Sequence, residues 1–368
     1  MIDLSYFQDI PKLSIKYLDS LKQDSNFNYY PVSKSPTYIG KKINMGYNCY
    51  AIKLYKITNE WSELSQKYQD SWIKYLMDFQ TNEIDVYNNY FIDPMVVEYF
   101  NKHFSAFNLK NLTKSTLNML LKKNYELKDR HIFKTINADS KQAISTLNEV
   151  GRSIHKAPND FFNNFDSCEN YLNSYDWSKP WDAGAQFSSL ALYNSTFNLH
   201  LEKNLISFIE NKLDLETGSY FDSAPKSPRQ VINGAMKVIS GLDWLCHPIQ
   251  MPDKLIDFCL ANKPEFEGCD LVDYIYVLYK CSLQTNHKKK DIQKVLMEIL
   301  EYFNLLYHQK EHGFSYYVNK SQTHYYGIKI SKGENIADIH GTILSVWGIV
   351  MVLTLLDKNK FGYNTIKP

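Results

Sequence analysis

The segment Asn335–Leu355 combines a polar start with a long apolar body, and it constrains the fold more than any other stretch. Asp338, His340 and Thr342 open it, and nearly all later residues are apolar. This pattern is typical of a helix whose body is buried and whose N-terminus faces a cleft. Five earlier segments begin in the same way, near residues 46, 139, 183, 232 and 270. The sequence therefore predicts six buried helices.

From residue 139 onward, amphipathic segments alternate with the buried ones, at 159–174, 199–213, 252–262 and 290–307. Helix pairs of this kind are too many for a four-helix bundle and suit a closed double ring. The sequence therefore predicts an all-α fold, an (α/α)6 toroid, with a possible β-hairpin that pairs 314–318 with 325–330. We interpret residues 1–368 as one domain, because no linker divides them, and assign the irregular stretch 80–135 to an insertion or lid.

Charge and cysteine content narrow the class of protein. The 41 basic and 40 acidic residues nearly cancel, so no general attraction to nucleic acid or anionic membranes is expected. The six cysteines include no Cys-x-x-Cys pair, which favours buried free thiols in a reducing compartment. The N-terminus lacks the features of a secretory signal, and the apolar stretch 339–355 contains polar residues. We therefore predict a cytoplasmic protein without an integral membrane segment.

Polar residues at the starts of the buried helices are the candidates for a functional site. In a closed ring the inner helices run in one direction, so their N-termini meet at one mouth. The catalytic candidates are Asp182, Asp270, Asp273, Asp338 and His340. Asp270 and Asp273 share a helical face, where two carboxylates can split their pKa values or hold a metal. Each of these aspartates has the alternative role of an N-cap.

Other polar residues at these openings are candidates for substrate binding. Gln142, Gln186 and Lys237 lie a turn or more inside their helices, where capping does not explain them, and the same holds for the catalytic candidate Asp273. Arg229 precedes Asn233 and Lys237 by four and eight residues at a helix entrance. This arrangement suits an anion site, and a salt bridge to a nearby aspartate remains the alternative. Further polar residues at these openings are Asn48, Asp139 and Lys141.

Aromatic residues make up 15% of the chain. Trp181 opens one buried helix, and Tyr326 lies in the cluster Thr323-His-Tyr-Tyr. An aromatic cavity suits either isoprenoid chains or sugar rings, although aromatic residues in helices often serve only as core. We count Trp181 and Tyr326 among the substrate-binding candidates.

Two loop-and-helix units, which begin at Glu216 and Glu311, resemble the repeats of terpenoid cyclases and protein prenyltransferases. Leu-Val-Asp273 is similar to the prenyltransferase β-subunit segment whose aspartate binds zinc, and Asp-Ile-His340-Gly-Thr resembles the segment that supplies the zinc histidine. The resemblance implies a toroid with Asp273 and His340 as ligands. The cysteine expected two residues after the aspartate is Ile275, and the Asp-x-Asp-Asp motif of class II cyclases is absent. We therefore predict no tightly bound zinc and no other cofactor.

Together these features predict an enzyme with an aromatic-lined cleft that acts on an isoprenoid or polyprenyl-linked substrate. One alternative is a carbohydrate-active enzyme (hydrolase, lyase or epimerase), because such rings also host those and two carboxylates suit glycosidic chemistry. The other is a non-catalytic binding toroid, whose polar mouth residues would all be satisfied as caps. The expected partner is a small-molecule or lipid-linked substrate, and the oligomeric state stays open.

Overall fold

The computed structural model describes the chain apart from residues 1–3, 24–26, 82–86, 103, 122–126, 159–164, 224, 226 and 265–267. Most of the described residues are helical, which confirms the predicted all-α class. Strands in this part form three short antiparallel pairs. Within the described residues, the helices lack the length or apolar character needed to cross a bilayer.

In the described part of the chain, six helices are buried along much of their length, and they match the six buried helices that the sequence predicts. They are α2 (Met45–Ile57), α7 (Lys128–Glu149), α9 (Pro180–Phe197), α11 (Pro228–Trp244), α13 (Gly268–Ser282) and α15 (Ile339–Leu355). Each contacts the next in this order, and α15 contacts α2, so the contacts close a cycle. Helix α7 begins well before the predicted residue 139, because its first turns are only partly buried and carry no apolar pattern.

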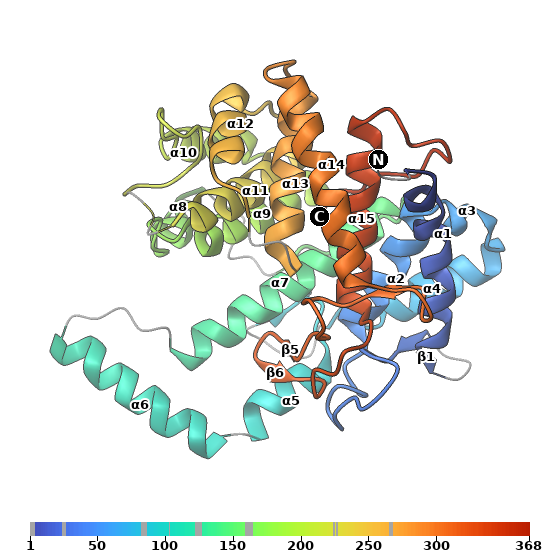
Figure 1. The fold of residues 1–368 in the computed structure, drawn as a ribbon. Helices are drawn as coiled ribbons and strands as arrows, with labels where there is room; N and C mark the ends of the chain where they lie inside the picture. The colour runs from blue at the N-terminus through green and yellow to red at the C-terminus, as the bar shows by residue number, and fades with distance from the viewer. Residues whose placement is uncertain are drawn as a thin grey trace.

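Shorter or more amphipathic helices lie outside these six (Figure 1). They are α1 (Leu4–Ser20), α3 (Glu60–Glu63), α4 (Gln66–Met77), α8 (Phe165–Asn173), α10 (Glu202–Glu210), α12 (Pro252–Ala261) and α14 (Lys289–Leu306). Helix α1 contacts α2 and α15, α8 and α10 contact α9, and α12 and α14 contact α13. In α14 the buried residues recur at helical spacing, from Ile292 through Leu296 and Leu300 to Phe303. One apolar face of each outer helix therefore packs on an inner helix.

The stretch 80–135, predicted as an insertion or lid, contains α5 (Pro94–Lys102), α6 (Phe104–Leu121) and the start of α7. Helix α6 extends away from the main body of the molecule (Figure 1). Residues 82–86, 103 and 122–126 of this stretch lie outside the described part. A role as a lid therefore stays a prediction.

The strands pair differently from the predicted hairpin. The pairs are β1 (Lys22–Gln23) with β2 (Asn28–Tyr29), β3 (Tyr307–His308) with β4 (Gly313–Phe314), and β5 (His324–Tyr325) with β6 (Ile328–Lys329). The predicted pairing of 314–318 with 325–330 is wrong, since β4 pairs with β3 and β5 with β6. Tyr326 and Gly327 both have positive φ, +44° and +87°. Two such residues form a tight turn, so β5 and β6 pair with each other directly across it.

The C-terminal segment 363–368 holds the ends of several inner helices. The N–H of Asn364 donates to the carbonyl of Ile57 at the end of α2 (2.8 Å). The N–H of Lys367 donates to the carboxylate of Glu149, the last residue of α7 (2.9 Å). Residues near the ends of α11 and α13 bond to the same segment, namely Trp244 and Tyr279. These four helices therefore end on one side of the molecule.

The segment 313–338 packs against the opposite ends. The N–H of Cys269, in the first turn of α13, donates to Tyr316 Oη (3.3 Å). Tyr325 Oη lies so close to Gly46, in the first turn of α2, that any side chain at position 46 would collide with it. Glycine at this position therefore permits the close packing of the segment on the helix start.

Candidate functional site

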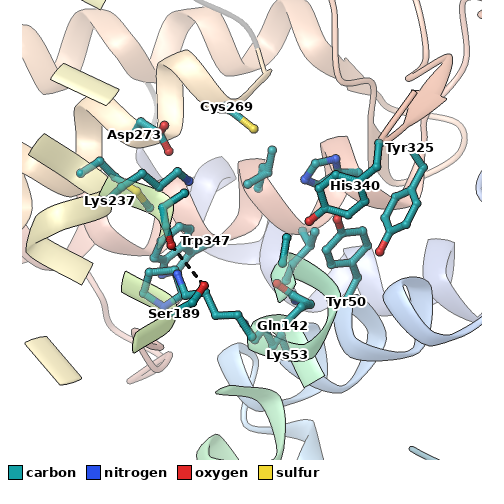
Figure 2. A pocket seen from close by; sticks show the side chains of 18 of the residues that line it. Tyr50, Lys53, Gln142, Ser189, Lys237, Cys269, Asp273, Tyr325, His340 and Trp347 are labelled. Atoms are coloured by element: carbon teal, nitrogen blue, oxygen red, sulfur yellow. Dashed lines mark hydrogen bonds between the residues drawn. The ribbon is translucent and has the colours of Figure 1, made fainter. Parts of the chain in front are cut away.

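A cavity of about 360 Å³ lies between the six inner helices, and every one of them contributes to its lining (Figure 2). Its volume falls in the lower part of the range for small-molecule sites. Apolar lining includes Met236, Ile343, Leu344 and Ile366. The polar and aromatic lining residues are Tyr50, Lys53, Lys141, Gln142, Trp181, Gln186, Ser189, Lys237, Cys269, Asp273, Gln322, Tyr325, Tyr326, His340 and Trp347.

Three lysines from three different helices converge on this cavity: Lys53 of α2, Lys141 of α7 and Lys237 of α11. Lys53 is 4% exposed and donates to the hydroxyl of Ser145 (2.9 Å). Burial lowers the pKa of Lys53 to about 8. Burial, together with the charges of Lys237 and Lys53, lowers the pKa of Lys141 well below its usual value. The cavity therefore gathers amines from three helices against one carboxylate side chain of the described lining, an arrangement that favours an anionic ligand.

Among the described residues, Asp273 is the one carboxylate side chain in this lining. It is 3% exposed, and its Oδ2 has no hydrogen-bond partner in the described residues. Burial raises the pKa of Asp273 to about 6, and the nearby charge of Lys237 opposes this shift. Figure 2 shows Asp273 and Lys237 on the same side of the cavity. A carboxyl group with a pKa near neutrality can both donate and accept a proton at physiological pH.

His340 faces Asp273 from the other side of the cavity (Figure 2). Its ring stacks on Tyr50, with centroids 4.7 Å apart and planes at 5°, and also contacts Tyr316 (5.1 Å). Its buried Nδ1 has no hydrogen-bond partner in the described part of the chain. Burial and the charge of Lys237 lower the pKa of His340 to about 3. The ring is therefore a neutral imidazole whose Nδ1 is buried without a partner in the described residues.

Aromatic rings form much of the remaining wall. Trp347 packs against Tyr276 (5.3 Å), and its buried Nε1 has no partner among the described residues. Trp181 lies at the cavity with the guanidinium of Arg229 5.3 Å from its ring centre. Tyr326 lines the cavity and is 40% exposed, so it lies where the cavity meets solvent. Flat rings of this kind suit apolar or cationic parts of a ligand.

Asp338 lies outside the cavity lining and caps α15. Its Oδ1 accepts from the N–H of Gly341 (2.7 Å), and its Oδ2 accepts from the N–H groups of Tyr316 (2.7 Å) and Gln322 (2.9 Å). Both oxygens are therefore occupied by the backbone, and the residue is 1% exposed. Burial raises its pKa to about 6 despite these bonds. The carboxylate ties the segment 313–338 to the start of α15 and so positions Gln322 in the cavity wall.

Arg229, Asn233 and Asp270 form a cluster that also lies outside the cavity lining. The Nε and Nη2 of Arg229 donate to the two oxygens of Asp270 (2.9 and 2.7 Å). Asn233 Nδ2 donates to Asp270 Oδ1 (2.5 Å). The structure therefore shows the alternative at Arg229, a salt bridge to Asp270, in place of the expected anion site. The cluster joins α11 to α13 and holds Arg229 over Trp181.

Replacing Arg229 by Lys is expected to lower the free energy of unfolding by about 1 kcal/mol, because lysine cannot make the two parallel bonds to Asp270. Half of the Arg229 side chain is exposed, at 47%, which limits the loss. Urea unfolding measures this effect, and ligand affinity measured alongside is expected to stay unchanged. A large loss of affinity with unchanged stability would instead place Arg229 in contact with the ligand.

The other sequence candidates divide between lining and surface. Gln142, Gln186, Trp181 and Tyr326 line the cavity. Gln186 Oε1 accepts from Asn137 (2.9 Å) and Tyr171 (2.6 Å), which orients its amide. Asp182 is exposed and pairs with Lys134 (2.6 Å), so the structure separates it from the cavity. Asn48 bonds to Trp72 and Phe27 within the packing of α2.

Sequence reasoning missed Lys53 and Tyr50 of α2, together with Trp347 of α15. Lys53 carries the signal that selected Lys237, a charge a full turn inside a buried helix. Tyr50 and Trp347 carry no such signal, because aromatic residues in buried helices usually belong to the core. Only the closed cycle of contacts shows which face of each helix meets the cavity.

The residues present do not fit the zinc ion that the family resemblance implies. Asp273 and His340 both line the cavity and each has an unpaired atom. The third position, Ile275, is fully buried and apolar. Among the described residues, no three His, Cys, Asp or Glu side chains come together as a metal site. Zinc sites in proteins take at least three such ligands.

Comparison of the chain with protein-family models, with curated proteins and with solved structures finds no match in any of the three. A function for this chain is therefore inferred from the cavity and its side chains.

Proposed function

We propose that this chain is an (α/α)6 toroid enzyme that acts on an isoprenoid substrate carrying a phosphate or diphosphate. The observation that carries the proposal is the convergence of Lys53, Lys141 and Lys237 on a cavity where Asp273 is the one carboxylate side chain of the described lining. The cyclic contacts of the inner helices support the toroid. The likeness of the segments around Asp273 and His340 to prenyltransferase segments supports the substrate class.

In this proposal Lys53 and Lys237 bind the anionic end and balance the negative charge that develops on a departing diphosphate. The aromatic wall, with Tyr50 and Trp347, holds the apolar chain and stabilises positive charge on it. Asp273 and the neutral His340 are the two groups placed to move protons. The small volume of the cavity favours a short isoprenoid chain over a complete polyprenyl chain. A cytoplasmic location accords with a substrate of this kind.

The carbohydrate alternative receives less support from the same side chains. Glycosidic cleavage uses two carboxyl groups across the scissile bond. Asp273 lines the cavity, whereas Asp270 is paired with Arg229 and Asp338 is occupied by backbone N–H groups. The non-catalytic alternative is disfavoured too, because Asp273 and His340 have unpaired atoms that no cap requires.

The test is calorimetric titration with geranyl diphosphate, geraniol and inorganic diphosphate. Replacing Lys237 by Met is expected to weaken geranyl diphosphate binding by about 10-fold to 100-fold, the equivalent of one or two charge-assisted bonds. Geraniol binding should change little. The matched control is Lys203→Met on the outer helix α10, where the lysine is exposed. Equal loss in both variants, or no binding of any of the three ligands, would refute the proposal.

The catalytic part is tested with Asp273→Asn under the same conditions. This variant removes the titrating carboxyl and keeps its shape, so geranyl diphosphate should still bind while product formation is lost. The melting temperature should stay close to that of the parent, because Oδ2 makes no hydrogen bond to lose. A sharp drop in melting temperature would instead show that Asp273 is structural.

A further inference from the structure

Lys141 differs from the other two cavity lysines in its contacts. In the part of the chain that the structure describes, its side-chain nitrogen makes neither a hydrogen bond nor an ion pair, although it lines the cavity. Lys53, by contrast, donates to Ser145. A lysine that holds the fold together would have a partner of this kind. The amine of Lys141 is therefore available to a ligand.

The groups that face Lys141 favour its neutral form. Lys53 on α2 and Lys237 on α11 repel a charge on it, and Asp273 on α13 attracts one. The neighbouring helix α9 presents Gln186 and Ser189, which are uncharged. Burial is the largest contribution, and the pKa of Lys141 falls well below its usual value. An amine that is both desolvated and placed beside other cations is the arrangement that makes lysine nucleophilic.

We propose that Lys141 is a nucleophile that condenses with an aldehyde or ketone carbonyl of a small anionic ligand and forms an imine in the cavity. This inference needs only the cavity and does not depend on the ligand being an isoprenoid. The anionic part of the ligand would lie on Lys237 and Lys53, which line the same cavity. The carbonyl carbon would then lie within reach of the Lys141 nitrogen.

The step balances with groups that the cavity holds. The nitrogen lone pair of Lys141 forms a bond to the carbonyl carbon, and a nitrogen proton passes to the oxygen to give a carbinolamine. A proton from the Asp273 carboxyl then lets the hydroxyl leave as water, and the nitrogen lone pair forms the double bond. The product is a protonated imine beside the Asp273 carboxylate, which compensates its charge.

Trapping with sodium borohydride tests the proposal, with pyridoxal 5′-phosphate as the probe because it carries an aldehyde and a phosphate. Peptide mass spectrometry is expected to find the reduced adduct on Lys141 ahead of exposed lysines, by about tenfold for each unit by which its pKa lies below theirs. Lys141→Arg, which keeps a long basic side chain but has no primary amine to form an imine, should lose this adduct. Labelling spread over exposed lysines with none on Lys141 would overturn the proposal.

Two further measurements separate the parts of the inference. Pyridoxal, which lacks the phosphate, should label Lys141 more weakly. Equal labelling would contradict the part of the proposal that makes the ligand anionic. Reductive alkylation with propionaldehyde and cyanoborohydride gives a pH profile that needs no anion. In Lys237→Met the midpoint of this profile should move to higher pH, since a repelling charge is gone. An unchanged midpoint would contradict the activation of Lys141 by its neighbours.

Discussion

Replacing Asp139 by Asn is expected to remove a steep fall in stability between about pH 5 and pH 8. Asp139 is 2% exposed, and burial raises its pKa from 3.8 to about 8. Over this range the folded chain holds a proton that the unfolded chain has released. Stability therefore falls as pH rises, by about 1.4 kcal/mol for each pH unit. Relative to the parent, the variant should gain about 4 kcal/mol across this interval.

Asparagine is the suitable replacement because it resembles a protonated carboxyl group and can keep the bond from the Tyr325 hydroxyl. Urea unfolding of both proteins at several pH values gives the difference directly. Asp182→Asn is the control, because that aspartate is exposed. The stability of its variant should change with pH in the same way as that of the parent. A parallel course for the Asp139 variant as well would show that the carboxyl is ionised in the folded chain.

Asp338→Asn is expected to lower the free energy of unfolding by about 3 kcal/mol. The carboxylate accepts three backbone N–H groups on its two oxygens. An amide has one accepting oxygen, so its NH2 group would face at least one buried N–H, and each buried donor without a partner costs about 1–3 kcal/mol. Loss of the cap on α15 adds to this.

The same variant should also weaken ligand binding, because Asp338 anchors Gln322, and the neighbouring Tyr325 lines the cavity too. Asp182→Asn again serves as the control, since Asp182 also lies in the first turn of an inner helix but is itself exposed and pairs with Lys134. Urea midpoints measure both variants. Equal shifts of the two urea midpoints would mean that the three backbone hydrogen bonds of Asp338 contribute no more to stability than one surface ion pair.

Part of the site follows from the sequence by a single physical rule. A charged or amide side chain inside an apolar helix is costly unless it meets a partner or a cavity. This rule selected Gln142, Gln186, Lys237 and Asp273, and all four line the cavity. The rule is local to each helix, so it needs no knowledge of which helices are neighbours.

The roles of Arg229, Asp270 and Asp338 were not decided by the sequence. Each is a polar residue near a helix start, where capping, ion pairing and ligand binding look alike in one dimension. The structure separates them, since Asp270 meets Arg229 across two helices and Asp338 meets a distant loop. Partners far apart in sequence are brought together only by the fold.

The sequence by itself determined the all-α class and the six buried helices, because burial imposes an apolar pattern with helical spacing that is visible along the chain. The strand pairing near residue 325 and the grouping of Lys53, Lys141 and Lys237 were decided only by the tertiary structure. The two-residue turn at Tyr326 and Gly327 pairs β5 with β6, so this part of the chain does not form the longer hairpin that the sequence predicts. The lysines meet because the contacts of the inner helices close a cycle, a long-range arrangement that no local pattern records.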